Sequence, residues 1–203
     1  SMLLQLGMPN VALRFFPTFR TEDNRHNGLL GLLLLPILVG FIVFTIVMWL
    51  SYTRLQEWLV TLKTNPLAGQ FLYMLLPLAF FMVLSAVLTQ HIKNFYRIVV
   101  PTLLDNVWVK IATGTLSLLF VYGVLQVFGF VVGIVIAYGV VTVGLFAYLG
   151  WLGQLYLKPN FTVLDRPLLR SIGIFAFYGV LGSVGSSLMT YVDRTMITLL
   201  IPE

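Results

Sequence analysis

Lys110 is a cation inside a mostly apolar stretch that begins at Val99 and also contains Asp105. If this stretch is a helix that crosses a bilayer, a rise of about 1.5 Å per residue places Lys110 roughly 16 Å into it, near the middle. Asn106 lies one turn earlier on the same face, whereas Asp105 lies about 140° around the helix and is poorly placed as a partner. Lys110 is therefore a candidate for a cavity that holds water or an anion, and an ion pair with an acid from another segment is the alternative.

Arg14 is a second cation in an apolar run, Met2 to Phe16, and Asn10 precedes it by one helical turn. The two would form a polar stripe on one helix face, as expected for a hydrated cavity. Alternatively, Arg14 anchors the helix about one turn from the cytoplasmic surface. Near the other end of the chain, Asp193 and Arg194 follow an apolar span, either as a gate or as a self-neutralising cap at the membrane interface.

The sequence does not indicate enzyme chemistry. His26 and His91 lie in or beside loops, the seven acidic residues are scattered, and no HExxH, GxSxG or GxxxxGK run is present. The chain has no cysteine, so a disulfide or a cysteine-based metal site is impossible. We expect neither an enzyme nor a bound metal or cofactor.

The composition is that of an integral membrane protein. Hydrophobic residues make up 59% of the chain, charged residues only 9%, and the mean hydropathy is +0.97. The net charge of +5 could suggest a nucleic-acid partner, but the cations occur singly between apolar spans and form no basic run. The expected partner is therefore the lipid bilayer, and no nucleic acid.

The chain divides into apolar runs long enough to cross a hydrocarbon core of roughly 30 Å. After a partial span at 2–16, complete spans are predicted within 27–53, 64–92, 99–126, the second part of 111–157, and 171–192. A hairpin near 122–129 must divide the long charge-free run. Residues 54–63 place apolar side chains at helical spacings, which predicts a short interfacial helix.

Small residues recur in two of these spans. Gly179, Gly182 and Gly185 occur at every third position of the last span, and Gly129 and Gly133 make a GxxxG spacing after the predicted hairpin. Small residues at such spacings let helix backbones approach closely. These five glycines are therefore the predicted helix-packing positions.

The distribution of cations predicts the orientation. Assigning alternate loops to the two sides places nine of the twelve Lys and Arg residues on or toward one side, and leaves Arg54, Lys63 and Arg194 for the other. By the positive-inside rule, the first side is cytoplasmic.

The last span resembles a known family. A charged entry (Asp165, Arg166 and Arg170), a small-residue span and an Asp193-Arg194 pair are similar to the seventh transmembrane helix of the polysaccharide-flippase branch of the multidrug/oligosaccharidyl-lipid/polysaccharide exporter superfamily. The segment MLLQLGMPNVALRFFPTFR at the N-terminus resembles that family's second helix and first cytoplasmic loop. The spans between fit helices three to six.

The resemblance implies an all-α, polytopic transmembrane helical bundle. Residues 1–157 would form a partial N-terminal lobe of a two-lobed exporter, and residues 158–203 a connector and the first helix of the second lobe. We expect one helix before this chain and several after it, so the remainder of the same transporter would be a partner. The implied localisation is multi-pass, in the bacterial cytoplasmic (inner) membrane.

The implied function is a flippase of polysaccharide or lipopolysaccharide biosynthesis. It would translocate a lipid-linked oligosaccharide by alternating access through a cavity near the bilayer midplane. One alternative is a drug/cation antiporter of the same superfamily, which needs an intramembrane acid. A non-transporting membrane scaffold subunit is another, and it should not need Lys110.

Overall fold

The computed structural model describes residues 5, 7–21, 26–61, 71–161 and 164–200, and for most of 55–61 and 190–200 it describes the backbone alone. Within these residues the chain is helical, with no strand. Its elements are α1 (Met8–Phe19), η2 (His26–Gly28), α2 (Leu29–Thr61), η3 (Leu72–Met74), α4 (Leu75–Lys93), α5 (Val99–Thr102), the π-helical η4 (Leu103–Trp108), α6 (Val109–Val121), α7 (Val127–Trp151) and α8 (Arg166–Leu200).

Within the described residues, five segments are long and apolar enough to cross a membrane, which confirms the predicted polytopic bundle. They are Leu29–Tyr52, Leu75–Lys93, Val99–Val121, Val127–Trp151 and Arg166–Ser186. The third segment joins α5, η4 and α6 into one continuous span. The predicted hairpin is also confirmed, because α6 ends at Val121 and α7 begins at Val127.

The prediction of a separate interfacial helix at 54–63 was wrong. Helix α2 continues through Arg54 to Thr61, so the segment is helical but continuous with the helix that contains the preceding span, Leu29–Tyr52. Between Tyr52 and Thr61 there is neither glycine nor proline, so nothing interrupts the backbone hydrogen bonding when the side chains become polar. At 33 residues, α2 is roughly 50 Å long, well beyond a hydrocarbon core.

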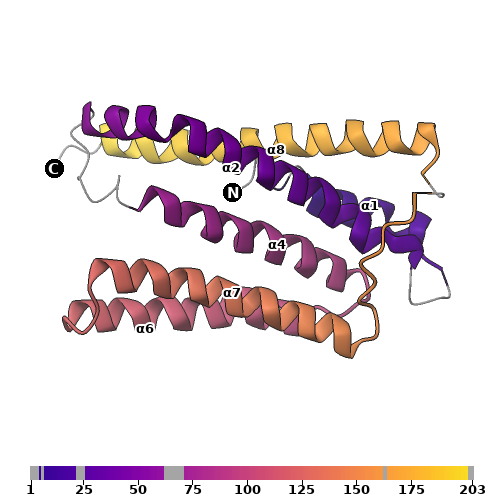
Figure 1. Cartoon of the computed structure of the whole chain (residues 1–203), viewed down its shortest axis with the longest axis horizontal. Helices are drawn as coiled ribbons and strands as arrows, with labels where there is room; N and C mark the ends of the chain where they lie inside the picture. Colours follow the sequence, from indigo (N-terminus) through magenta and orange to yellow (C-terminus); the bar gives the residue numbers. More distant parts are fainter. Residues whose placement is uncertain (1–4, 6, 22–25, 62–70, 162–163, 201–203) are drawn as a thin grey trace.

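Helix α4 lies at the centre of the arrangement. Figure 1 shows it between the α6–α7 pair and the group formed by α1, α2 and α8. In the most apolar part of α4, 44% of the residues are buried, compared with 6% in the most apolar parts of Val99–Val121 and Arg166–Ser186. The other four spans, of which 6–28% is buried, therefore leave most of their apolar surface outside the bundle, as spans in contact with lipid do.

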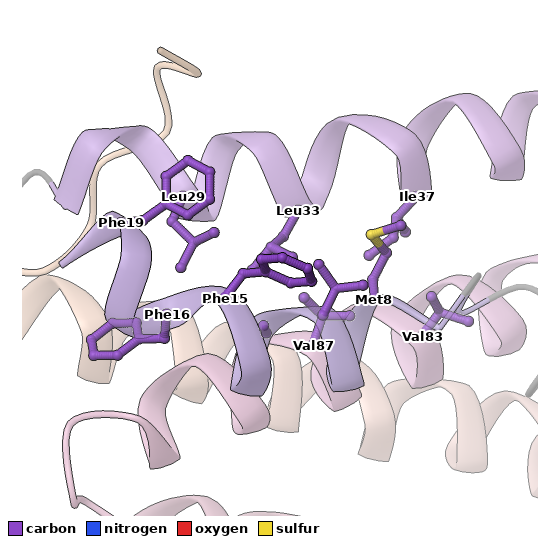
Figure 2. Packing of buried hydrophobic residues seen from close by; sticks show 11 residues of the cluster. Met8, Phe15, Phe16, Phe19, Leu29, Leu33, Ile37, Val83 and Val87 are labelled. Atoms are coloured by element: carbon purple, nitrogen blue, oxygen red, sulfur yellow. The ribbon is translucent and has the colours of Figure 1, made fainter. Parts of the chain in front are cut away.

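Two apolar clusters hold the helices, on neighbouring faces of α4 that lie about 100° apart around the helix. Val83 and Val87 pack against α1 and α2, where Phe15 and Leu33 join the same cluster (Figure 2). Leu84 and Leu88, each one position after Val83 and Val87, belong to a second cluster. That cluster contains the stripe Val141, Leu145 and Leu149, which repeats every four residues on α7.

Most of the basic residues that the structure describes lie toward one end of the bundle. Figure 1 shows that α1, α4 and α7 end there and that α2 and α8 begin there, whereas the α6–α7 hairpin lies at the opposite end. We call this the basic end, because it carries the cations that flank these helix termini: Arg20, Lys93, Arg97, Lys158 and Arg166. It is the end that the sequence predicts to be cytoplasmic.

Candidate functional site

Helices α1 and α8 approach each other through glycine. Gly7 has a φ of +67°, and a Cβ at that position would lie 2.6 Å from the backbone oxygen of Ala176 on α8. A Cβ on Gly179 would lie 3.5 Å from both the Gly7 Cα and the Asn10 Nδ2. This contact, which we call the α1–α8 seam, brings Asn10 of the predicted polar stripe against α8.

Arg14 lies in the same seam, one turn further along α1. The central carbon of its guanidinium is 4.4 Å from the ring centroid of Phe175 on α8 and 5.9 Å from that of Phe15. The two rings meet edge to face at 5.9 Å between centroids. A cation over an aromatic face gains about 0.5–1 kcal/mol at an exposed site, and the contact leaves the charge in place.

Among the described residues, no carboxylate forms an ion pair with Arg14. An arginine that is held by aromatic rings and not neutralised by an acid keeps its hydrogen-bond donors for an anion. The structure therefore places the two residues of the predicted N-terminal stripe, Asn10 and Arg14, against the first span of the C-terminal segment. The sequence could not identify Phe175 as the partner, because it lies 161 positions away.

Lys110 lies in a different layer of the bundle. It is exposed near the start of α6, directly after the π-helical segment that contains Asn106, and α6 packs chiefly on α7. Helix α4 separates these two helices from α1 and α8 (Figure 1). Within the described residues, Lys110 and Arg14 thus do not converge on one site.

Asp105 has a partner that sequence reasoning missed. The hydroxyl of Thr89 on α4 donates a short hydrogen bond to Asp105 Oδ2 in η4, and this contact links two spans within the bundle. A π-helical turn inside an α-helical span is rare and often occurs at functional sites. Asp105 is half-buried on the α4 side, whereas Lys110 is exposed, so the two charges point to different surroundings. In the sequence, the one indication that this span carries a polar contact is its polar ending, Thr89-Gln90-His91.

The remaining predicted positions have varied surroundings. A Cβ on Gly133 would lie 2.5 Å from a Leu116 methyl group on α6, and one on Gly129 would lie 3.1 Å from Leu125. No described atom lies within 4 Å of a Cβ built on Gly182 or Gly185. On α8, the close approach to α1 is therefore made at Gly179. The side chains of Asp193 and Arg194 lie outside the described part of the chain.

A cluster of polar side chains that includes His26 and Gln154 lies at the basic end. His26 Nε2 donates a hydrogen bond to Gln154 Oε1 over 2.8 Å and so links the segment before α2 to the α7–α8 connector, 128 positions later. The His26 and His91 rings both pack on Phe95, each 5.2 Å between centroids. In the sequence the two histidines are separate residues in or beside loops, and only the fold brings them together.

These features define a multi-pass helical membrane protein with an arginine at a close crossing of its first and last helices. A family model described as "Polysaccharide biosynthesis protein" matches residues 1–203, the whole chain. The chain belongs to this family, and the resemblance stated from the sequence is confirmed. No curated protein and no solved structure matches it.

Proposed function

We propose that this chain belongs to a flippase that carries a lipid-linked oligosaccharide across the bacterial cytoplasmic membrane by alternating access. Its membership of a polysaccharide biosynthesis family, and the five helices in its described part that are long and apolar enough to cross a membrane, support an exporter of polysaccharide material. Chemistry on the substrate is not required for this role. The task is to move a charged and hydroxyl-rich head group past hydrocarbon while its lipid tail stays in the bilayer.

The observation that carries the proposal is Arg14 in the α1–α8 seam. A diphosphate head group carries about two negative charges, and hydrocarbon alone would strip its water at a cost of many kcal/mol. A guanidinium can replace part of that hydration with charge-assisted, bidentate hydrogen bonds. Arg14 is suited to this role, because Phe175 holds its guanidinium at 4.4 Å without cancelling the charge.

The seam also joins the two segments that would move relative to each other. Asn10 and Arg14 belong to the N-terminal segment, whereas Phe175 and Gly179 belong to the span after the connector. An anion that is bound by the N–H donors of Arg14 and draws the guanidinium toward itself would lengthen the contact with the Phe175 ring. Binding of the head group would then weaken one contact between the two segments, which is how a substrate shifts a conformational equilibrium.

The test is complementation of glycan export in cells that lack the full-length gene. Arg14→Gln should lower export about tenfold or more, since it removes the charge, and Arg14→Lys should keep part of the activity. Arg170→Gln is the matched control, because it removes one cation from an exposed position on α8 at the same end of the bundle. Membrane abundance of each variant separates loss of transport from loss of protein.

Each outcome discriminates between functions. Normal export by Arg14→Gln would remove the role of this residue, and normal export by Arg14→Gln together with Lys110→Gln would favour a scaffold subunit. Loss of protein in place of transport would indicate that Arg14 serves folding.

A drug/cation antiporter of the same superfamily is the second candidate, and Asp105 is the observation that favours it. An antiporter needs an acid within a span to bind an ion or an organic cation, and Asp105 is such an acid, held by Thr89 across two helices. Asp105→Asn should abolish cation-dependent drug export if this function holds. Unchanged glycan export by the same variant would leave the flippase proposal intact.

A further inference from the structure

A polar pocket of about 550 Å³ opens at the basic end, apart from the α1–α8 seam. Its walls come from three parts of the chain: the end of α1 and the segment before α2, the turn after α4, and the α7–α8 connector. The lining residues are Phe16, Arg20, Thr21, His26, Asn94, Phe95, Tyr96 and Gln154. The volume lies within the range of sites for small molecules, roughly 300–1,000 Å³.

Tertiary contacts fix the shape of this pocket. The His26–Gln154 hydrogen bond joins two of its walls, and Asn94 Nδ2 donates to the backbone oxygen of Ala12 over 2.8 Å, which joins the third. His26 and Tyr96 have φ angles of +38° and +59°, and they are the two non-glycine residues with positive φ in the described chain. Non-glycine residues rarely hold such angles, and they cluster where surrounding structure enforces a functional geometry.

The chemistry of the walls suits a phosphate group. Arg20 supplies a guanidinium, whose planar donors match phosphate oxygens, and Lys93 and Arg97 flank the turn that carries Asn94. The amides of Asn94 and Gln154 and the hydroxyl of Thr21 add polar groups for the atoms around a phosphate. A lone inorganic ion would occupy only a small part of 550 Å³, so a larger phosphate-bearing head group fits better.

The position of the pocket favours a head group that belongs to a lipid. Tyr96, which lines the pocket, is 85% exposed, and the apolar side chains of Ile98 and Val99 beside it are 57% and 70% exposed. An exposed tyrosine next to apolar residues, at the basic end of a bundle of spans, is typical of the membrane interface. Basic pockets between helices at this level bind anionic lipid head groups.

We propose that this pocket binds the phosphate-bearing head group of a lipid in the leaflet at the basic end, with Arg20 as the main charged contact. The lipid is either an anionic phospholipid of the membrane or the polyprenyl diphosphate end of a glycan carrier. The inference rests on insertion in a membrane and on the pocket, and it does not depend on Arg14 or on transport.

The experiment uses the full-length protein purified in a neutral detergent. The probes are short-chain phosphatidylglycerol, short-chain phosphatidylcholine, a short-chain polyprenyl diphosphate and inorganic phosphate, each titrated while binding and the thermal unfolding midpoint are measured. Arg20→Gln should weaken binding of the anionic lipid about tenfold, and Arg20→Lys should restore part of it. Arg170→Gln, an equal change of charge at an exposed site outside the pocket, should bind like the parent.

The probes separate the two sources of the head group. Arg20-dependent binding of phosphatidylglycerol alone identifies a phospholipid site, and displacement of phosphatidylglycerol by polyprenyl diphosphate identifies a site for the carrier lipid.

Three results would overturn the proposal. Equal weakening by Arg20→Gln and Arg170→Gln would mean that only overall charge matters. Binding of inorganic phosphate as tightly as of the anionic lipids would exclude a lipid head-group site. Absence of binding by both anionic lipids would show that the pocket has another role. Because Arg20 is exposed, its substitution leaves the packing of the helices intact.

Discussion

Replacement of Gly31 by alanine tests how the α7–α8 connector is held against the first helices. Gly31 lies in the first turn of α2, and a Cβ there would be 2.3 Å from the backbone oxygen of Leu157 and 2.8 Å from the backbone nitrogen of Pro159. Ordinary contacts of a Cβ begin at about 3.4 Å, so α2 or the connector must shift by about 1.1 Å. The obstacle is backbone, so a side-chain rotation cannot relieve it.

The expected magnitude is the difference between two effects. Alanine in place of glycine favours a helix by about 1 kcal/mol, whereas overpacking of a tight contact costs roughly 1–3 kcal/mol and more where backbone must move. We expect a net destabilisation of about 2 kcal/mol, which corresponds to a fall of about 4–8 °C in the unfolding midpoint for a chain of this size. A shifted connector would also strain the His26–Gln154 hydrogen bond.

The assay is thermal unfolding of the full-length protein in detergent, followed by its intrinsic fluorescence, together with its abundance in the membrane. Gly114→Ala on α6 is the matched control, because no atom of another described residue that packs on it lies within 4 Å of its Cβ position, and it should raise the midpoint slightly through helix propensity. If Gly31→Ala unfolded at the parent's midpoint or above it, as Gly114→Ala should, the close packing of the connector on α2 would be refuted.

Three further sets of substitutions test the spans. Lys110→Arg should keep part of the glycan export, whereas Lys110→Gln should lose most of it with the protein still present in the membrane. Normal export by Lys110→Gln in the complementation assay would rule out an anion-binding role for Lys110. Thr89→Val removes the donor to Asp105 and should lower stability by about 1–3 kcal/mol, with Thr89→Ser close to the parent in thermal unfolding; equal midpoints for both would show that the hydrogen bond is dispensable. Gly179→Leu should reduce the abundance of the protein in the membrane, because the Cβ position of Gly179 already touches Asn10 and Gly7. The Gly182→Leu variant should accumulate normally, and the reverse order of abundance on immunoblots would place the tight helix contact at Gly182.

The arrangement of spans was largely predictable from the sequence. Membrane spans can be located from the linear sequence, because a bilayer of fixed thickness requires about 20 apolar residues whatever neighbours the helix has. The 47 uncharged residues from Ile111 to Leu157 had to contain a turn, and the structure places it between Val121 and Val127. The error at Arg54–Thr61 has the same origin, because polar side chains mark the membrane boundary and do not end a helix.

The lateral contacts were not predictable, because most of these spans are apolar on every side. A helix such as α7 has no polar face to indicate its buried side, so its sequence has no periodic pattern from which a partner could be inferred. The pairing of Thr89 with Asp105 depends on how α4 meets the π-helical turn, and the pairing of His26 with Gln154 joins positions 128 residues apart.

For the candidate site, the sequence determined which residues carry charge within the membrane, and the tertiary structure decided which of them come together. Arg14 and Asn10 could be assigned to one helix face from their spacing alone, because that face follows from 3.6 residues per turn. Their position against Phe175 and Gly179 follows from the approach of α8 to Gly7, where the absence of a Cβ lets two backbones meet. The separation of Lys110 from Arg14 is likewise a property of the fold, because α4 packs between the helices that carry them.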